Sequence, residues 1–169
     1  MKVSEGNVIV TGASRGIGLA TAEAILARGG RVVAVARDRA KLEALRVQHP
    51  DRVRVLVADL RELGQVEMLV QEAADAFGGI DGLVNNAGVL HYEEVGGISV
   101  DALRSMLDVN LAAPLFWMQA IQPHLKGKGG AIVNVSSTAS IRAVQGLAAY
   151  SASKAALNAL TRSFARALA

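Results

Sequence analysis

Short apolar segments alternate with longer segments of helical period along the chain. The apolar, β-branched runs lie at positions 8–10, 32–35, 53–57, 83–84 and 132–135. Segments with the period of a helix lie at 18–28, 38–47, 62–77 and about 100–125, and a last one starts near Tyr150 and runs on to Ala169. Continuous apolar strands separated by helices are typical of a parallel sheet covered on both faces. The pattern therefore predicts a doubly wound α/β fold with five strands.

Length and composition agree with one globular domain. The chain has 169 residues, of which 51% are hydrophobic, enough to bury a sizeable core. Cysteine is absent, so disulfide bonds, thiolate metal sites and cysteine nucleophiles are excluded. From the polar start we expect no signal peptide, and no apolar run reaches membrane-spanning length. We therefore expect a cytoplasmic protein without a membrane partner.

The charge distribution argues against a nucleic-acid partner. The formal net charge is +3, and the basic surplus is scattered between Arg28 and Arg54 without interleaved aromatic residues. Such a distribution is typical of a solvated face, although single members can contact a phosphate. The three histidines, His49, His91 and His124, are isolated, so we expect no metal site.

A glycine-rich segment follows the first predicted strand. It reads TGASRGIG, Thr11 to Gly18, and a predicted helix follows it. Glycines let the backbone turn tightly and approach a diphosphate, and a helix N-terminus presents free amides to it. The spacing G-x-x-x-G-x-G differs from the G-x-G-x-x-G fingerprint. Its place between the first strand and a helix nevertheless indicates a phosphate-binding loop.

The end of the second predicted strand bears on the choice between NAD(H) and NADP(H). An acidic residue there binds the ribose hydroxyls of NAD, whereas an arginine accommodates the 2′-phosphate of NADP. Here Ala36 ends the strand and Arg37 follows, and Arg15 in the glycine loop is a second candidate partner for phosphate. Asp38 is either that acid displaced by two positions or the N-cap of the next helix, which we favour. We therefore predict NADP(H) in preference to NAD(H).

Polar motifs follow the third, fourth and fifth predicted strands. Asp59 ends the third, where a carboxylate can accept a hydrogen bond from an adenine amino group. NNAG, residues 85–88, ends the fourth, and NVSS, residues 134–137, ends the fifth. Ligands of open parallel sheets bind at the carboxyl ends of the strands, so these motifs belong to one predicted site.

A tyrosine and a lysine, Tyr150 and Lys154 in YSASK, begin the last predicted helix. Their spacing of four residues places both side chains on one face. The ammonium can then stabilise the neighbouring phenolate, so that the tyrosine can exchange a proton near neutral pH. An exposed helical turn with an unrelated tyrosine and lysine is the alternative that these two residues by themselves leave open.

The full set of motifs resembles the short-chain dehydrogenase/reductase family. The matching residues are TGASRGIG, Asp59, NNAG, Asn110 in DVNLAAP, Ser137 and YSASK, in the family's order, with Ser137 thirteen positions before Tyr150. The resemblance implies a Rossmann-type, dinucleotide-binding domain over residues 1–169 and an NADP-dependent oxidoreductase. The implied reaction moves a hydride between the nicotinamide and a small-molecule ketone, 3-oxoacyl group or secondary alcohol, with 3-oxoacyl-[acyl-carrier-protein] reductases among the similar enzymes.

The resemblance also assigns roles to single residues. Ser137 would hydrogen-bond the substrate carbonyl, Tyr150 would donate or accept its proton, and Lys154 would hold the nicotinamide ribose. Asn110 would support a water-mediated proton relay. The expected cofactor contacts come from Gly12, Ser14, Arg15, Gly16, Ile17, Gly18, Arg37, Asp59, Asn86, Ala87, Gly88, Tyr150 and Lys154.

The chain departs from the family's pattern after the Tyr/Lys helix. Family members continue into a sixth strand, a Pro-Gly loop, a substrate-binding segment and a final strand, which this sequence lacks. We expect either a fragment of a longer enzyme, which we favour, or a surface covered by a partner chain. The stripe Ala152, Ala155, Ala156 and Ala159 indicates the helical interface of a homodimer or homotetramer, with packing on the sheet as the alternative. A non-catalytic NADP(H)-binding or regulatory protein is the alternative function.

Overall fold

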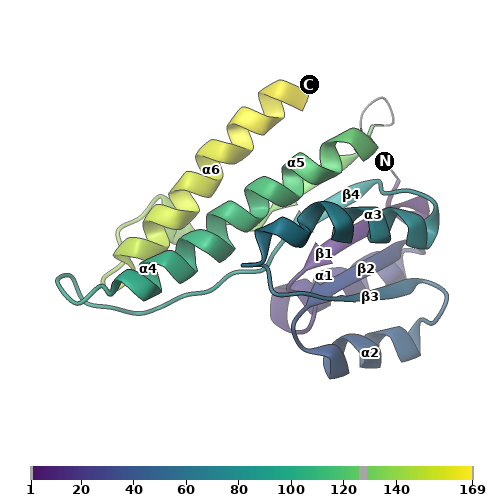
Figure 1. Cartoon of the computed structure of the whole chain (residues 1–169), viewed down its shortest axis with the longest axis horizontal. Helices are drawn as coiled ribbons and strands as arrows, with labels where there is room; N and C mark the ends of the chain where they lie inside the picture. Colours follow the sequence, from purple (N-terminus) through teal and green to yellow (C-terminus); the bar gives the residue numbers. More distant parts are fainter. Residues whose placement is uncertain (1, 126–128, 169) are drawn as a thin grey trace.

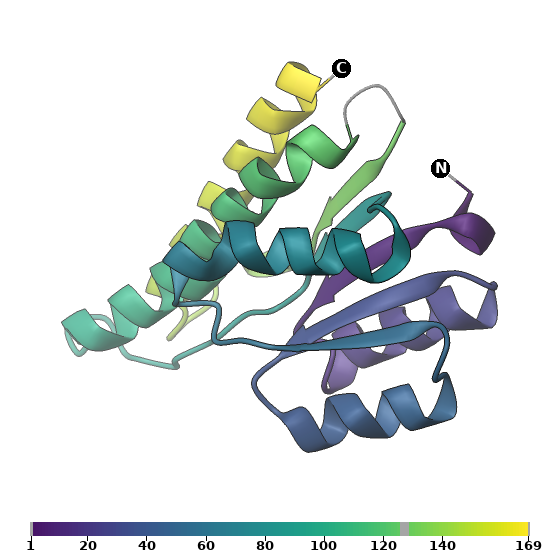
Figure 2. The same cartoon turned by 45° about the vertical axis from the view of Figure 1, so that its right-hand side comes forward.

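A computed structural model describes residues 2–125 and 129–168 of the chain, and a twisted parallel sheet forms its centre (Figures 1 and 2). Its strands are β1 (Asn7–Thr11), β2 (Arg31–Ala36), β3 (Val53–Val57), β4 (Gly82–Asn85) and β5 (Ala131–Asn134). They lie in the order β3-β2-β1-β4-β5, and every neighbouring pair is parallel. The chain thus leaves β1 toward one edge and returns on its other side, which confirms the predicted doubly wound topology.

The helices follow the predicted order, with differences in their bounds and one interruption. They are α1 (Gly16–Ala27), α2 (Arg39–Gln48), α3 (Val66–Phe77), α4 (Val100–Leu107), α5 (Ala113–Leu125) and α6 (Ala148–Leu168). The helix predicted from residue 62 begins at Val66, because residues 63–65 form a 3₁₀ turn. The helix predicted over 100–125 is interrupted by a π turn at Asp108–Ala112. α6 starts before Tyr150, and Ala169, its predicted end, lies outside the described residues.

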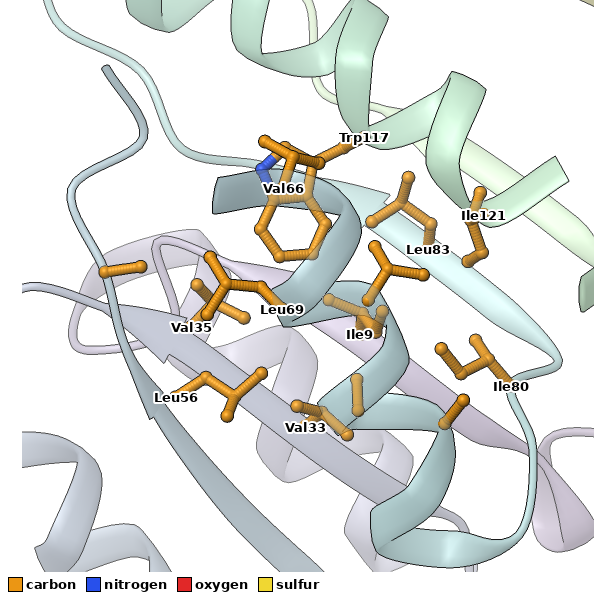
Figure 3. Packing of buried hydrophobic residues seen from close by; sticks show 14 of the residues in the cluster. Ile9, Val33, Val35, Leu56, Val66, Leu69, Ile80, Leu83, Trp117 and Ile121 are labelled. Carbon is orange, nitrogen blue, oxygen red and sulfur yellow. The ribbon is translucent and has the colours of Figure 1, made fainter. Parts of the chain in front are cut away.

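Helices cover both faces of the sheet, as predicted. Side chains alternate along β1, so that Val8 and Val10 contact the layer of α1 and α2, whereas Ile9 contacts the layer of α3 and α5. Figure 3 shows Trp117 and Ile121 of α5 gathered with α3 residues over Ile9 and its neighbours. Fully burying an apolar side chain of this size stabilises the fold by about 1.5–3 kcal/mol. This packing fixes the carboxyl ends of the strands, where the predicted site lies.

β5 is the outer strand on the side of α5 and α6. Val133, on its face toward the α1 and α2 layer, is 53% exposed, so no described element covers this part of the strand. No helix within 2–125 and 129–168 is long and apolar enough to cross a membrane.

Candidate active site

The glycine loop connects β1 to α1 and leaves room for a diphosphate. Gly12 and Gly16 have positive φ angles of 68° and 56°, which an L side chain adopts only with strain. A Cβ on Gly18 would collide with the Gly12 carbonyl and the Asn86 amide, whereas a Cβ on Gly16 would meet no atom within 4 Å. The N-cap residue Arg15 makes no side-chain hydrogen bond to the first turn of α1. The loop therefore presents open space and helix amides to an anion, as a dinucleotide requires.

Thr11 connects the glycine loop to the NNAG segment. Its hydroxyl oxygen accepts hydrogen bonds from the backbone amides of Asn86 and Ala87, each at 3.1 Å, and the Asn86 amide group donates to the Thr11 carbonyl at 2.9 Å. Thr11 was not among the predicted site residues. A polar residue at the end of a buried strand was the available signal, because such a side chain needs a partner.

At the end of β2, Arg37 is exposed and Asp38 is engaged with α2. The Asp38 carboxylate accepts a hydrogen bond from the Lys41 backbone amide at 3.1 Å and lies 3.3 Å from the Lys41 ammonium. These contacts to Lys41 hold the pKa of Asp38 below its usual range. Asp38 therefore caps α2, as the favoured interpretation predicted.

Asp59 follows β3, next to the end of β2, because the Ala58 amide donates to the Ala36 carbonyl at 3.1 Å. Its carboxylate pairs with the guanidinium of Arg61. The hydrogen bonds from Arg61, together with the nearby charges of Arg61 and Arg37, lower the pKa of Asp59 to about 2. The carboxylate is thus ionised at neutral pH and able to accept a further hydrogen bond.

Ser137 lies three residues beyond β5, at the N-cap of the 3₁₀ turn Thr138–Ser140. Its hydroxyl oxygen accepts a hydrogen bond from the Ala139 amide at 3.1 Å. Accepting this bond leaves the hydroxyl proton available for donation to another oxygen. Ser137 is therefore held in place by the turn without losing its capacity to donate.

Tyr150 and Lys154 occupy the first turns of α6 and lie on one face, as their spacing predicted. Lys154 is 4% exposed, and its ammonium donates to the Val135 carbonyl at 2.8 Å. The same nitrogen lies 6.0 Å from the centre of the Tyr150 ring. Burial lowers the pKa of Lys154 below its usual value. Val135, which was not among the predicted site residues, anchors the lysine beside the tyrosine through its carbonyl.

Asn110 lies in the π turn between α4 and α5 and is fully buried. Its amide group donates to the Val89 carbonyl at 2.9 Å and to the Ser153 hydroxyl at 3.0 Å, and its side-chain oxygen accepts from the Val89 amide at 2.9 Å. Both amide hydrogens are therefore used within the protein. The Asn110 side chain could therefore take part in a proton relay only as a hydrogen-bond acceptor.

Gly88 brings Asn110 and Lys154 together. A Cβ on Gly88 would lie 3.3 Å from the Asn110 side-chain oxygen and 3.5 Å from the Lys154 nitrogen. The end of the NNAG segment, the π turn and α6 thus meet at one edge of the sheet. Among the described residues, no hydrogen bond joins Ser137 to Tyr150.

The remaining predicted residues vary in exposure. Ser14 is half-buried, and Arg15 and Arg37 are exposed. Ile17, at the start of α1, is 65% exposed. In the described part of the chain, no three His, Cys, Asp or Glu side chains are grouped in a way that could hold a metal ion.

Known proteins are similar to this chain in sequence. Residues 6–169 match the short chain dehydrogenase family. Galactitol 2-dehydrogenase of Agrobacterium fabrum is 34% identical over 170 residues, which cover 99% of this chain and 66% of that protein. 2-(R)-hydroxypropyl-CoM dehydrogenase of Xanthobacter autotrophicus is 39% identical over 165 residues, 93% of this chain and 66% of that protein.

A solved structure agrees over nearly the whole chain. The crystal structure of a short-chain dehydrogenase from Streptomyces avermitilis superposes with a TM-score of 0.93 and 31% sequence identity. The match covers 99% of this chain and 62% of that one, so the chain spans about two thirds of the length of its first relatives. Because the family match includes the glycine loop, the NNAG segment and the YSASK helix at one sheet edge, the chain belongs to the short chain dehydrogenase family.

Proposed function

We propose that the chain carries the cofactor site and the proton-transfer residues of an NADP(H)-dependent oxidoreductase. The observation that carries the proposal is the buried Lys154 ammonium, fixed on Val135 beside Tyr150 at the sheet edge that also holds the glycine loop. A cation buried without a carboxylate is unfavourable, and such arrangements concentrate at functional sites. This supports a role for Lys154 toward Tyr150 and a bound ligand.

The proposed proton path runs through Tyr150. When bound, the nicotinamide supplies or accepts the hydride at the substrate carbon. The Tyr150 hydroxyl then gives a proton to the substrate oxygen in reduction, or takes it in oxidation, and the Lys154 ammonium stabilises the phenolate. The Ser137 hydroxyl donates a hydrogen bond to the same oxygen and stabilises the charge that develops there.

The cofactor preference follows from the residues at the end of β2. The Asp38 carboxylate is bound to the backbone amide and the ammonium of Lys41, which supports its assignment as the cap of α2 over its assignment as the acid that holds the ribose in NAD-binding proteins. Arg37 and Arg15 are exposed and carry the charge that a 2′-phosphate requires. We therefore assign NADP(H) in preference to NAD(H), and cellular reduction as the favoured direction.

The proposed substrate is a small molecule with a ketone or a secondary alcohol. Relatives named for the dehydrogenation of galactitol and of 2-(R)-hydroxypropyl-CoM support this class. A 3-oxoacyl group, as in 3-oxoacyl-[acyl-carrier-protein] reductases, is the narrower form of the proposal. We place the enzyme in the cytoplasm as a homodimer or homotetramer, in which the exposed Ala152, Ala155 and Ala159 of α6 would pack between subunits.

Tyr150→Phe tests the proposal. We expect it to lower kcat for NADPH-dependent reduction by about 10²–10⁴-fold, because it removes the proton donor, while the Kd for NADPH stays within about threefold. Absorbance at 340 nm with a panel of ketones and 3-oxoacyl thioesters measures turnover, and calorimetry measures binding. Tyr92→Phe is the matched control, since it makes the same change at the other tyrosine of the chain.

Two results separate the possible failures. Full turnover by Tyr150→Phe would contradict the role of Tyr150. NADPH binding without turnover of any substrate by the wild type would instead favour the non-catalytic NADP(H)-binding protein.

A further inference from the structure

The carboxylate of Asp59 accepts several hydrogen bonds from one nearby residue, Arg61. The backbone amide and the Nε of Arg61 both donate to Oδ1 of Asp59, each at 3.0 Å. Nη2 of Arg61 donates to Oδ2 at 2.5 Å, so the guanidinium binds both carboxylate oxygens side-on. A planar fork of this kind restricts a carboxylate to one orientation, which a single lysine contact does not do.

The orientation matters because Asp59 lies at the edge of the proposed cofactor site. The Ala58 amide, bonded to the Ala36 carbonyl, fixes the start of this segment beside the end of β2 and Arg37. The Asp59 side chain is still 26% exposed, so a ligand can reach it. The Nε proton of Arg61 is shared between Oδ1 and Oδ2, at 3.0 and 3.2 Å, so only three N–H groups of Arg61 bind the carboxylate. A carboxylate can accept about four hydrogen bonds, so capacity for one more remains.

We propose that Arg61 is a positioning residue of the cofactor site, which holds the Asp59 carboxylate in the orientation that accepts the adenine amino group of NADP(H). The inference rests on the proposed function. It gives Arg61 a different task from Arg37. The Arg61 guanidinium is already bound to a carboxylate, whereas Arg37 makes no ion pair within 4.0 Å in the described part of the chain and is free for a phosphate.

The experiment compares cofactors that differ in one group. Calorimetric titrations use NADPH, NADH and deamino-NADPH, in which a carbonyl replaces the adenine amino group. We expect the wild type to bind NADPH about tenfold more tightly than deamino-NADPH, since the amino group donates to a charged acceptor. Arg61→Ala should reduce this preference by about threefold or more. It should weaken the binding of NADPH and of NADH equally, because both cofactors carry the adenine amino group.

Two further variants separate positioning from charge. Arg61→Lys keeps the charge but loses the fork, so it should resemble Arg61→Ala. Arg46→Ala is the matched control. It removes an exposed arginine that also pairs with a carboxylate, Glu43, in the last turn of α2, and it should leave all three affinities unchanged.

The ligand-free protein provides a readout that does not depend on binding. In the wild type, NMR should show the Asp59 carboxyl titrating near pH 2, and in Arg61→Ala its pKa should rise toward the ordinary value of 3.8, because the largest cause of the lowered pKa, the side-chain hydrogen bond from Arg61, is removed. An unchanged titration in the variant would overturn the pairing itself.

The outcomes distinguish this inference from the proposed function. If the wild type binds neither NADPH nor NADH, the proposed function fails and the inference with it. If the wild type binds but Arg61→Ala keeps the full preference for the amino group, only the inference is wrong. It is also wrong if Arg61→Ala weakens NADPH alone, because Arg61 would then act on the 2′-phosphate.

Discussion

Two neighbouring residues after β2, Arg37 and Asp38, carry opposite charges and differ in their contacts. Asp38 lies at the N-cap of α2 and is bonded to Lys41, whereas the guanidinium of Arg37 is exposed. In the sequence, Asp38 fitted two interpretations, as a ribose ligand or as a helix cap. The hydrogen bond from the Lys41 amide supports the helix cap. The proposed preference for NADP(H) therefore depends on Arg37.

Arg37→Ala should weaken NADPH binding by about tenfold or more and NADH binding by less than about twofold, because a charge-assisted bond to the 2′-phosphate is lost. Asp38→Asn, which can still cap α2, should leave NADH binding unchanged. Calorimetric titration of both variants checks this. A large loss of NADH affinity in Asp38→Asn would show that Asp38 holds the ribose hydroxyls.

Gly146 precedes α6 and has a φ angle of 74°, with the Tyr92 ring packed against its Cα. Gly146→Ala should lower the free energy of unfolding by about 1–2 kcal/mol, the backbone cost of a left-handed L residue. The cost stays near this value because Tyr92 is 66% exposed and its ring can swing away. Urea unfolding measures the change.

Gly64→Ala is the control for this prediction. Gly64 has no strained φ angle, and a Cβ there would meet no atom within 4 Å, so the variant should be as stable as the wild type or slightly more stable. Equal stability of Gly146→Ala and Gly64→Ala would contradict the assigned strain.

At the scale of elements, Asn110 connects three segments. Its side chain joins the π turn to Val89 after β4 and to Ser153 in α6. Asn110→Ala should lower the free energy of unfolding by about 2–4 kcal/mol, because it leaves buried partners without hydrogen bonds.

Ser153→Ala is the matched comparison for Asn110→Ala. It removes the Ser153 partner alone and should cost about 1 kcal/mol, so thermal or urea unfolding of the two variants can be compared directly. If Asn110→Ala destabilises no more than Ser153→Ala, the connecting role is wrong.

The predicted elements agree with the structure where the hydrophobic period is local. The five strands and the order of the helices were predicted, since apolar runs of strand length and segments of helical period are written in the sequence. The π turn was not predicted, because the apolar period runs through it and the contacts of Asn110 with Val89 and Ser153 arise only in the folded chain. The 3₁₀ turn at Leu63–Gln65 includes Gly64, a poor helix former that weakens the first predicted turn of α3.

The candidate site was predicted as motifs but not as contacts. Glycine spacing and the Tyr150–Lys154 interval indicated which residues belong to it. The anchors Thr11 and Val135 act through a hydroxyl and a backbone carbonyl that bind segments far away in sequence. Sequence patterns do not specify such partners, so only the fold could identify them.

At the scale of the whole molecule, the part of the sheet around β1 is packed more completely than the part around β5. β1 is bonded on both edges, by β2 and β4, and α1 and α2 pack on one face of this part of the sheet. On the other side, a cavity of about 540 Å³ lies between α5, β5 and α6, lined by Met118, Ile132, Thr161 and Phe164 among others. The proposed cofactor contacts from Gly12 to Gly88 are thus built on the well-packed part of the sheet, whereas Tyr150 and Lys154 lie on α6.

Calorimetric titration of the 169-residue chain with NADPH and, in parallel, with NADH tests the central claim most directly. We predict one binding site per chain and an affinity for NADPH at least about tenfold higher than for NADH, because Arg37 and Arg15 offer charge to the 2′-phosphate while Asp38 is used in capping α2. Equal or tighter binding of NADH, or binding of neither cofactor, would contradict it.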